Sequence, residues 1–513
     1  YYLQKACKYR DMARAFFEKM TGSRLIMDSM NDAQALALYL EAEKRGIPVE
    51  IISKRDIRKS RAKALGLNFL WFSNEIVRTL FRTVKRRPAR DKSKMVFFFH
   101  GAKFYASLRP VIAEIAEKSS GKVAIIAKGE TANGDRSPTQ TGQPIDFDDF
   151  RDFKYLGKLL QCSFRIRKEL HKHLSCIARQ PGPSLFREPR YLGYLFKTWF
   201  QDTAYRSIRS VLLADRALER LQPGVVIVAD PTDYVTKAFT LTGRTRGVSS
   251  FCIQFGMASK YDSEWRYFKQ DYLGVMGAEI AAIMKNNGIP EERIYVLGNP
   301  RYDSYFPDDH LKDRVRKDLN VPDSHVLVAF MSVPPVTEGI GKREAGLSLQ
   351  EYETILAMVY ELPDRLENMV LAVKPHPEEF EYIEYHKTFM GAEGPRKNRI
   401  RLIQNRNAYE IMNASDLVIT MQSTTGLEAI LLEKPLIMVN ITDREDYVNY
   451  ASSGAACRVS RREGLVPAVQ SLLHDHETAE HFRRTRKQYL KENLGYMYQS
   501  ARRSADVLLG LIH

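Results

Sequence analysis

Cysteine is scarce in this 513-residue chain, and the cysteines that are present do not pair by spacing. The five are scattered and form no C-x-x-C motif: Cys7, Cys162, Cys176, Cys252 and Cys457. An odd number of isolated cysteines argues against a disulfide framework and against a structural zinc site, and it favours a reducing compartment. We therefore expect a cytoplasmic location.

Long apolar runs are also missing. No stretch of about eighteen residues is free of charged side chains, so the sequence predicts no membrane-spanning helix. The first residues, YYLQKACKYRDMARAF, are too polar for a secretory signal. The chain starts with Tyr1 instead of Met, which we expect of a piece of a longer protein. Walker P-loop, HExxH and GxSxG motifs are absent, which removes three common catalytic signatures.

Positive charge is in excess and is concentrated in one block. The formal net charge is +16, and residues 54–94 hold fourteen Lys and Arg against three Asp and Glu, an excess of eleven. Inside this block, five apolar side chains can share one helical face: Phe69, Leu70, Phe72, Ile76 and Leu80. Two interpretations stay open. The block contacts an anionic membrane surface, at the inner face of the plasma membrane, or it is a helix packed on a domain beside a solvated basic linker.

Nucleic acid is not an expected partner. The sequence contains no zinc finger and no aromatic RNA-binding signature, and a basic run alone does not indicate nucleic-acid binding.

Apolar strands alternate with helices along most of the chain. Segments such as MVFFF (95–99) and VAIIA (123–127) have no polar alternation, which is typical of strands buried on both faces of a parallel sheet. The sequence predicts an α/β protein with an N-terminal α/β accessory segment and basic linker (1–90). Two doubly wound Rossmann-like domains follow (95–306 and 323–490), and then a C-terminal helical segment that crosses back (491–513).

Polar side chains follow several strands of the second domain, where ligands of parallel sheets bind. The most notable set is Gln422-Ser423-Thr424-Thr425-Gly426, at a strand-to-helix joint. Free backbone N–H groups and hydroxyls at such a joint suit a phosphate or a diphosphate. The alternative is a capping box formed by Thr425 and Glu428. Capping does not explain Gly426, which costs about 1 kcal/mol relative to Ala inside a helix, so we expect a close approach to the backbone there.

His376 lies between two prolines, directly after another apolar strand. The prolines stiffen the loop, so we expect the imidazole to contact the same phosphate. Lys374 is expected to be an ordinary surface lysine.

In the first domain, His100 and Asp230 follow apolar strands and are candidates for the general base that deprotonates an acceptor hydroxyl. The alternatives are that Asp230 forms an Asx turn before Pro231 and that His100 is a satisfied turn residue. Asp146 and Asp148 form a DxD string in a polar region, which we interpret as acidic surface.

The motifs KPHP (374–377) and STTGLEA (423–429), with GNPRYD (298–303) before them, resemble those of nucleotide-sugar proteins of GT-B architecture. The similarity is greatest to glycosyltransferases of bacterial capsule and surface polysaccharides, including the Kdo and sialic-acid types, and covers roughly residues 95–490.

This resemblance implies two domains facing across a cleft, with the donor in the second domain and the acceptor in the first. It implies phosphate binding by His376, Ser423, Thr424, Thr425 and Gly426, and ribose binding by Glu428. It implies no metal ion and no cofactor other than the nucleotide-sugar substrate.

The segments ADPTD, IQFG, GNPRYD and TTGLEA also resemble UDP-GlcNAc 2-epimerases. Where the epimerase pattern has a catalytic glutamate before a glycine, however, this chain has Gln254-Phe255-Gly256, and an amide cannot shuttle a proton. We therefore expect a glycosyltransferase that moves a sugar from a nucleotide-sugar to a surface-polysaccharide or lipid-linked glycan acceptor. An epimerase-like enzyme and a non-catalytic nucleotide-sugar-binding protein are the alternatives. The base, whether CMP, UDP or another, stays open.

Overall fold

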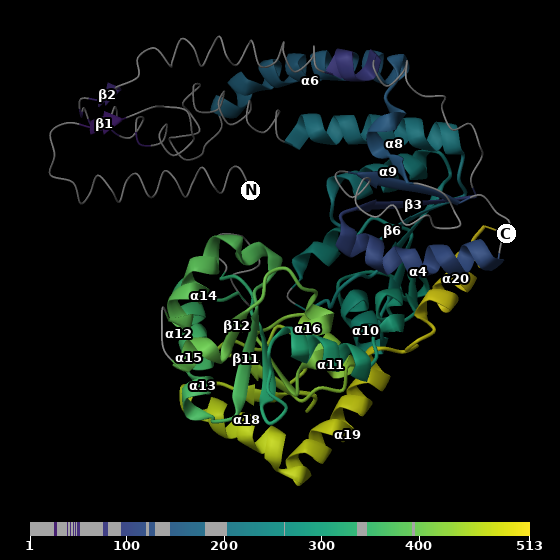
Figure 1. Ribbon diagram of the computed structural model, residues 1–513. Coiled ribbons are helices and arrows are strands. Elements are labelled where there is room, and N and C mark those ends of the chain that lie inside the picture. Colours follow the sequence, from purple (N-terminus) through teal and green to yellow (C-terminus); the bar gives the residue numbers. More distant parts are fainter. Residues whose placement is uncertain are drawn as a thin grey trace. The chain divides into compact units, whose positions relative to one another are not determined.

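The computed structural model shows an α/β protein (Figure 1). The residues that the structure describes are 25–27, 38, 42, 45, 47, 49–51, 75–80, 94–118, 123–128, 144–179, 203–260, 262–335, 346–391 and 395–512. Most of the N-terminal α/β accessory segment and basic linker expected at residues 1–90 lies outside them. In that region the structure shows two short parallel strands, β1 (Leu25–Met27) and β2 (Val49–Ile51).

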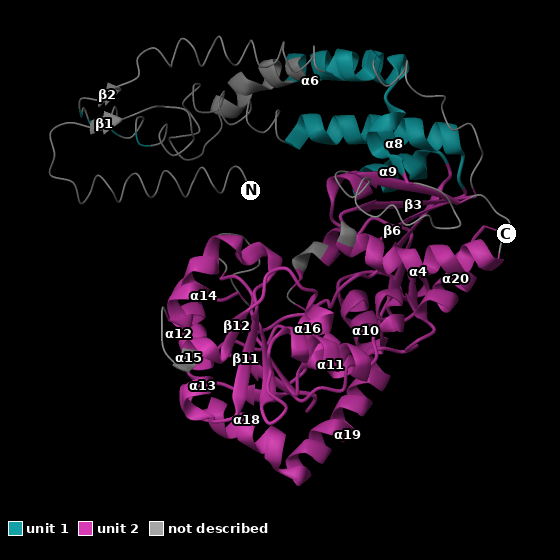
Figure 2. Ribbon diagram, viewed as in Figure 1, with its two compact units in different colours: residues 1–92, 145–223, 237–246 teal, residues 93–144, 224–236, 247–513 magenta. Residues whose placement is uncertain are grey.

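The chain forms two compact units (Figure 2). Unit 1 comprises residues 1–92, 145–223 and 237–246, and unit 2 comprises residues 93–144, 224–236 and 247–513. Unit 2 contains the six-stranded sheet, six of the seven strands of the other large sheet, and every residue predicted to belong to the functional site.

The first sheet has seven strands, six of which belong to unit 2 in the order β4-β3-β6-β7-β8-β9. All neighbouring pairs among the six are parallel. Their bounds are β3 (Met95–His100), β4 (Val123–Lys128), β6 (Val225–Val228), β7 (Ser249–Ile253), β8 (Tyr272–Val275) and β9 (Ile294–Val296). The predicted strands at 95–99 and 123–127 are therefore confirmed.

Helix α4 (Ala102–Lys118) follows β3 almost directly. The strand ends because Gly101 adopts a positive φ of +101°, and the Gly101 carbonyl then accepts from the Phe104 N–H at 3.2 Å, so the first helical turn begins at once. The other helical elements of unit 2 beside this sheet are α10 (Ala278–Asn286) and the 3-10 turn η6 (Pro300–Ser304). Helix α9 (Tyr234–Thr245) follows β6 along the chain, and most of it belongs to unit 1.

The second sheet has six parallel strands in the order β12-β11-β10-β13-β14-β15. The strands are β10 (Val326–Met331), β11 (Met369–Lys374), β12 (Ile400–Leu402), β13 (Leu417–Thr420), β14 (Leu436–Val439) and β15 (Cys457–Val459). The helical elements around them are α11 (Asp309–Asp318), α12 (Leu349–Tyr360), α13 (Leu362–Arg365), η7 (Pro377–Tyr382), α14 (Ile383–Met390), α15 (Pro395–Asn398), α16 (Ala408–Ala414), α17 (Thr425–Leu431) and α18 (Leu465–His474).

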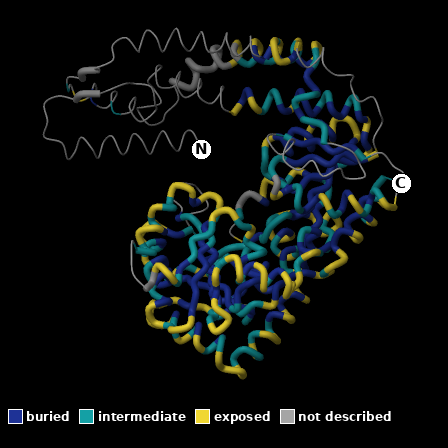
Figure 3. The backbone as a smooth tube through the Cα atoms, in the orientation of Figure 1, coloured by how far each residue is buried: buried dark blue, intermediate teal, exposed yellow. Residues whose placement is uncertain are grey.

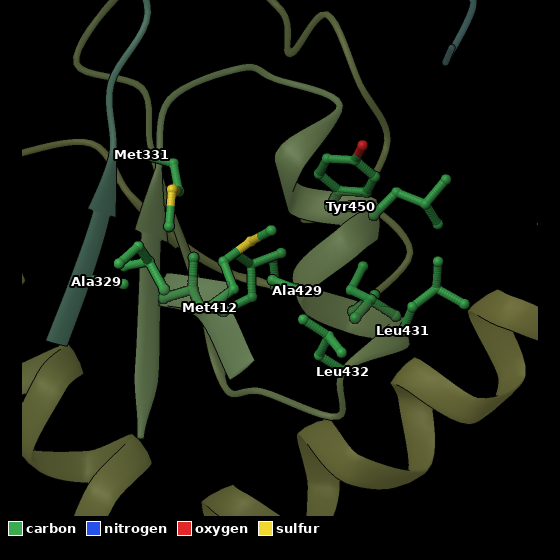
Figure 4. Packing of buried hydrophobic residues seen from close by; sticks show 14 of the residues in the cluster. Ala329, Met331, Met412, Ala429, Leu431, Leu432 and Tyr450 are labelled. Carbon is green, nitrogen blue, oxygen red and sulfur yellow. The ribbon is translucent and has the colours of Figure 1, made fainter. Parts of the chain in front are cut away.

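Both faces of this sheet are buried, which explains the missing polar alternation (Figure 3). Along β10, Leu327, Ala329 and Met331 join the cluster packed on α11, α16 and α17, part of which is seen in Figure 4. The intervening Val328 and Phe330 join the opposite cluster, on α12, α14 and α18. Successive side chains along the strand therefore enter the two cores in turn.

The chain ends in α19 (His476–Asn493) and α20 (Ser500–Gly510). Helix α20 packs beside α4 of the first domain, where the Lys118 Nζ atom lies 2.8 Å from Asp506 Oδ1, and Leu508 enters the core of the first sheet. The Asp303 carboxylate accepts from the N–H groups of Ser500 and Ala501, so η6 holds the start of α20.

In unit 1, α6 (Phe153–Arg179) lies beside α8 (Tyr205–Leu221), and the Lys158 ammonium pairs with Asp215 at 3.0 Å. The short elements β5 (Ile145–Asp146) and η1 (Phe147–Phe150) carry the DxD string. Asp148 is not plain acidic surface, because its carboxylate pairs with Arg151 and Arg209.

Most of the basic block 54–94, including Phe69, Leu70 and Phe72, lies outside the described residues. Residues 75–80 are helical, with Glu75 buried and Ile76 and Leu80 exposed by 38% and 42%. This helix nevertheless packs on unit 1, as the packed-helix interpretation expects, because the Glu75 carboxylate accepts from the Tyr155 hydroxyl at 3.2 Å and lies 3.4 Å from the Arg151 guanidinium. The apolar side chains Ile76 and Leu80 do not form that contact face. Among the described residues, no helix is both long and apolar enough to cross a bilayer.

Candidate functional site

The carboxyl edge of the second sheet gathers three of the predicted segments. Register pairs Met331 at the end of β10 with Lys374 of β11 and with Thr420 of β13. The loop of His376 and the turn of residues 421–425 therefore leave the same edge on either side of β10. Two strand spacings separate them, which is about 10 Å.

The turn after β13 is built on hydroxyl groups. The Thr420 hydroxyl donates to the Met331 carbonyl at 3.2 Å and lies 3.1 Å from the Thr425 hydroxyl. The Ser423 hydroxyl accepts only a long contact, 3.4 Å, from the Thr425 N–H. Within the described part of the chain, the Thr424 hydroxyl has no hydrogen-bond partner.

Helix capping does not explain this turn. The N-cap of α17 is Thr424, and its side chain makes no capping hydrogen bond. Glu428 does not reach back to the helix start, because its carboxylate pairs with Arg301 at 2.9 Å. The predicted alternative, a capping box of Thr425 and Glu428, is wrong.

Gly426 has a packing reason that the sequence did not reveal. A Cβ atom at this position would lie 2.4 Å from the ring of Tyr450, which is fully buried (Figure 4). The close approach expected at Gly426 is therefore made by a core side chain. The contact with Tyr450 explains why residue 426 is a glycine, and no ligand is needed for that explanation. Phosphate binding at Gly426 therefore stays a prediction.

Glu428 is buried against η6. Burial raises the pKa of its carboxyl, and the nearby Arg301 guanidinium opposes that shift. Arg301 also reaches the Tyr305 hydroxyl at 3.3 Å. The predicted ribose contact of Glu428 stays a prediction, and in this structure its partner is Arg301.

His376 is half-buried, and its loop is held by local hydrogen bonds. Its Nδ1 atom accepts from the Glu378 N–H at 3.1 Å, and its own N–H donates to the Glu379 carboxylate. Lys374 points to the Gln404 carbonyl at 2.9 Å, and burial lowers its pKa.

The carboxyl edge of the first sheet brings His100 and Asp230 together. Their strands, β3 and β6, are neighbours, and His100 Nε2 lies 3.5 Å from Asp230 Oδ2 and 3.8 Å from Asp233 Oδ1. Asp230 also accepts from the Thr232 N–H at 2.8 Å, as the Asx-turn interpretation predicts. The two oxygens of this carboxylate therefore face different partners, Oδ1 the turn and Oδ2 the His100 ring, and the catalytic role stays a prediction.

Gln254 occupies the end of β7 and is buried. Its amide NH₂ donates to the Gly256 carbonyl at 2.8 Å, and its amide oxygen accepts from the Met276 N–H at 3.0 Å. Only a group with both a donor and an acceptor satisfies the two backbone partners, so an ionised carboxylate is unsuited to this place.

The loop after β7 approaches the turn of the second sheet. A Cβ atom on Gly256 would lie 3.9 Å from the Thr424 hydroxyl oxygen. The Tyr447 hydroxyl donates to Asp262 of the same loop, and Lys260 pairs with Glu445 at 2.6 Å. The turn of residues 423–425 therefore lies next to the loop after β7 in the first domain and close to residues 445–447 of the second domain.

The described residues include no group of three or more His, Cys, Asp or Glu side chains placed to hold a metal ion.

A family model for UDP-N-acetylglucosamine 2-epimerase matches residues 272–496. The chain has no significant match among curated protein sequences. The S. aureus MnaA–UDP co-structure aligns with a TM-score of 0.52 at 13% identity, over 82% of this chain and 97% of that one.

Two further solved structures align comparably. The UDP-GlcNAc 2-epimerase from Neisseria meningitidis bound to UDP-GlcNAc gives a TM-score of 0.51 at 13% identity, over 81% of this chain and 99% of that one. The wall teichoic acid polymerase TagF gives 0.50 at 13% identity, over 89% and 98%. The chain has a GT-B-like fold of two parallel-sheet domains, as predicted. At this identity, the likeness shows the fold alone.

Sequence reasoning missed three residues of the two sheet edges: Asp233, Arg301 and Glu379. Arg301 lies inside the GNPRYD motif, and Glu379 lies two residues after KPHP. The motifs therefore indicated the right segments of the chain but not the side chains that these two residues contact. Asp233 has the same spacing signal as Asp230, in the string DPTD.

Proposed function

We propose that this protein is a glycosyltransferase that moves a sugar from a nucleotide-sugar to a hydroxyl of a surface-polysaccharide or lipid-linked glycan. The donor binds at the carboxyl edge of the second sheet, through His376, Ser423, Thr424 and Thr425. The acceptor binds at the carboxyl edge of the first sheet, beside His100.

The His100–Asp230 pair is the observation that supports this proposal most. An imidazole next to a carboxylate can take a proton from a hydroxyl, because the carboxylate orients the ring and stabilises the imidazolium. The His100 side chain is 29% exposed, so a substrate hydroxyl can reach it. Asp230 is 14% exposed and acts through the ring.

Leaving-group stabilisation is the task of the second sheet edge. Transfer leaves a nucleotide phosphate with added negative charge, which hydrogen-bond donors fixed in advance can stabilise. The hydroxyls of residues 423–425 and the His376 ring are donors of this type, and each follows a buried strand.

The test measures sugar release with and without an acceptor, using UDP- and CMP-linked donors. His100→Asn and Asp230→Asn are expected to lower transfer by about a hundredfold or more, the size of a general-base contribution. Both variants should retain nucleotide affinity. His310→Asn, on the exposed face of α11, is the matched control and should transfer normally. Normal transfer by His100→Asn would refute the assigned base.

Epimerisation of UDP-GlcNAc is the second candidate, favoured by the family match to residues 272–496. The buried amide of Gln254 argues against it. Incubation with UDP-GlcNAc alone decides between the two. The proposed transferase forms no 2-epimer of UDP-GlcNAc when the acceptor is absent. Formation of the 2-epimer without an acceptor would instead identify the protein as an epimerase. Nucleotide-sugar binding without any turnover indicates a non-catalytic binding protein.

A further inference from the structure

A fully buried carboxylate lies beneath the His376 loop. Glu379 is the third residue after His376, and its side chain is 0% exposed. One oxygen, Oε2, accepts from the Ser332 hydroxyl at 2.6 Å and from the His376 N–H. The other, Oε1, accepts from the Tyr352 hydroxyl at 2.8 Å and lies 3.4 Å from His386 Nε2.

These partners come from four different elements. Ser332 directly follows β10 and His376 follows β11, whereas Tyr352 belongs to α12 and His386 to α14. His386 is itself fully buried and lies 2.9 Å from the Tyr360 hydroxyl through Nδ1. Glu379 is therefore the common acceptor that joins the His376 loop to the neighbouring strand and to two helices.

Each donor of this buried set has an acceptor, and each Glu379 oxygen faces two donors. If Tyr360 donates to Nδ1 of His386, the Nε2–H of that ring faces Tyr352 and Glu379, and the Tyr352 hydroxyl donates to Glu379. Every polar hydrogen of this buried set then has an acceptor, which burial of a charge requires.

The ring of His376 is fixed as well as its backbone. Because Nδ1 accepts from the Glu378 N–H, Nδ1 carries no proton in this geometry, and the neutral ring carries it on Nε2. The backbone bond to Glu379 and the ring bond to Glu378 together form a closed capping box at the start of η7.

We propose that Glu379 is a positioning residue for the donor site: its buried carboxylate fixes the His376 loop to the end of β10 and thereby presents the Nε2–H of His376 to the nucleotide phosphate. This inference rests on the proposed function for its ligand. The fixing of the loop itself does not depend on that function.

Two variants separate positioning from general destabilisation. Glu379→Gln keeps the shape of the side chain but replaces one carboxylate oxygen with an NH₂ group. If Oε2 is replaced, the NH₂ group faces the donors of Ser332 and His376, and if Oε1 is replaced it faces the donor of Tyr352, so in either case a hydrogen bond is lost. Tyr360→Phe is the matched control, because it removes a hydroxyl from the same buried set without a direct bond to Glu379. Ser332→Ala removes a single donor to Oε2 and is the variant to use if Glu379→Gln does not fold.

Amide hydrogen exchange of the ligand-free protein is the first measurement. Glu379→Gln is expected to speed exchange in residues 376–382 by about tenfold or more relative to the rest of the second domain, whereas Tyr360→Phe leaves that segment unchanged. Ser332→Ala should act in the same direction as Glu379→Gln, with a smaller effect.

Nucleotide affinity is the second measurement, made by titrating CMP, CDP, UDP and GDP. For the nucleotide that binds, Glu379→Gln should raise Kd by about tenfold or more, as is usual when a residue that orients a ligand-binding side chain is lost, and Tyr360→Phe should not. Unchanged exchange and affinity in Glu379→Gln, or equal effects in Tyr360→Phe, overturn the inference. If the unsubstituted protein binds none of the four, the proposed function fails, while the exchange result still decides whether Glu379 fixes the loop.

Discussion

At the turn after β13, the Tyr450 ring fills the space that a side chain on residue 426 would need. This contact and the Arg301–Glu428 pair hold the first turn of α17 from two sides. Residues 423–425 keep their hydroxyls at the sheet edge, because the neighbouring positions are fixed by packing and by charge.

Gly426→Ala is expected to destabilise the protein by about 1–3 kcal/mol, the usual cost of overpacking. Without the Tyr450 contact, the same change would stabilise a helix by about 1 kcal/mol, so the sign of the effect is informative. Urea unfolding measures it, and Tyr450→Leu in the Gly426→Ala background should recover part of the loss. A more stable Gly426→Ala variant would contradict the packing role of Tyr450.

Glu379 makes a pH-dependent contribution to stability. Burial alone would raise the pKa of its carboxyl, but hydrogen bonds from His386, Ser332 and Tyr352 outweigh burial and lower it. A lowered folded-state pKa means that the stabilisation is present above the unfolded pKa, about 4.3, and is lost as pH falls through the folded value. The stability difference between the unsubstituted protein and Glu379→Gln should therefore be large at pH 7 and shrink below about pH 4.3.

Glu381→Gln, on the exposed side of η7, is the control for this pH experiment and should show no comparable trend. A Glu379→Gln difference that is constant from pH 7 to pH 3.5 argues against an ionised Glu379.

At the scale of elements, η6 joins three parts of unit 2. The Asn299 amide donates to the Phe255 carbonyl at 3.2 Å, Arg301 pairs with Glu428, and Asp303 accepts from the start of α20. A short turn after β9 therefore connects the first sheet, the second domain and the C-terminal helix.

Asp303→Ala removes the acceptor for two N–H groups at the start of α20, so we expect a loss of about 0.5–2 kcal/mol, typical of a lost helix cap. Limited proteolysis should cut the variant between α19 and α20 faster than the unsubstituted protein. Asp308→Ala removes a cap of the same kind from α11 and is the control. Equal cleavage near α20 in both variants would show that Asp303 does not hold the helix.

Most strands of unit 2 could be predicted because each has a local signal. An unbroken apolar run of four to six residues, such as Val326–Met331, is legible in the sequence when both faces of the sheet are buried. The predicted segments also meet at the sheet edges as expected, because parallel strands end on one side.

The partners of the site residues could not be predicted. Gly426 touches Tyr450, Glu428 pairs with Arg301, and Glu379 collects donors from four elements. The contacts of Gly426 with Tyr450, of Glu428 with Arg301, and of Glu379 with Ser332 and Tyr352 join segments that are well separated in the sequence. A single sequence does not indicate which distant side chains meet. Helix-capping reasoning failed at Thr425 for the same reason, because a tertiary ion pair took Glu428.

At the scale of the whole molecule, the fold alone does not select the chemistry. The same two-sheet arrangement is found in the UDP-GlcNAc 2-epimerase from Neisseria meningitidis and in the wall teichoic acid polymerase TagF, both at 13% identity. The chemistry has to be argued from the side chains at the sheet edges, where this chain places the His100–Asp230 pair and the buried amide of Gln254.

Isothermal titration of UDP, CDP, CMP and GDP into the protein and its His376→Ala variant tests the central claim most directly. The account predicts that at least one nucleotide binds with Kd below about 1 mM, equivalent to about −4 kcal/mol, and that His376→Ala weakens it by about tenfold or more. Thr424→Val, which removes the hydroxyl without a change in shape, should weaken the same nucleotide. Binding of no nucleotide, or equal binding by all three proteins, would contradict a donor site at this edge of the second sheet.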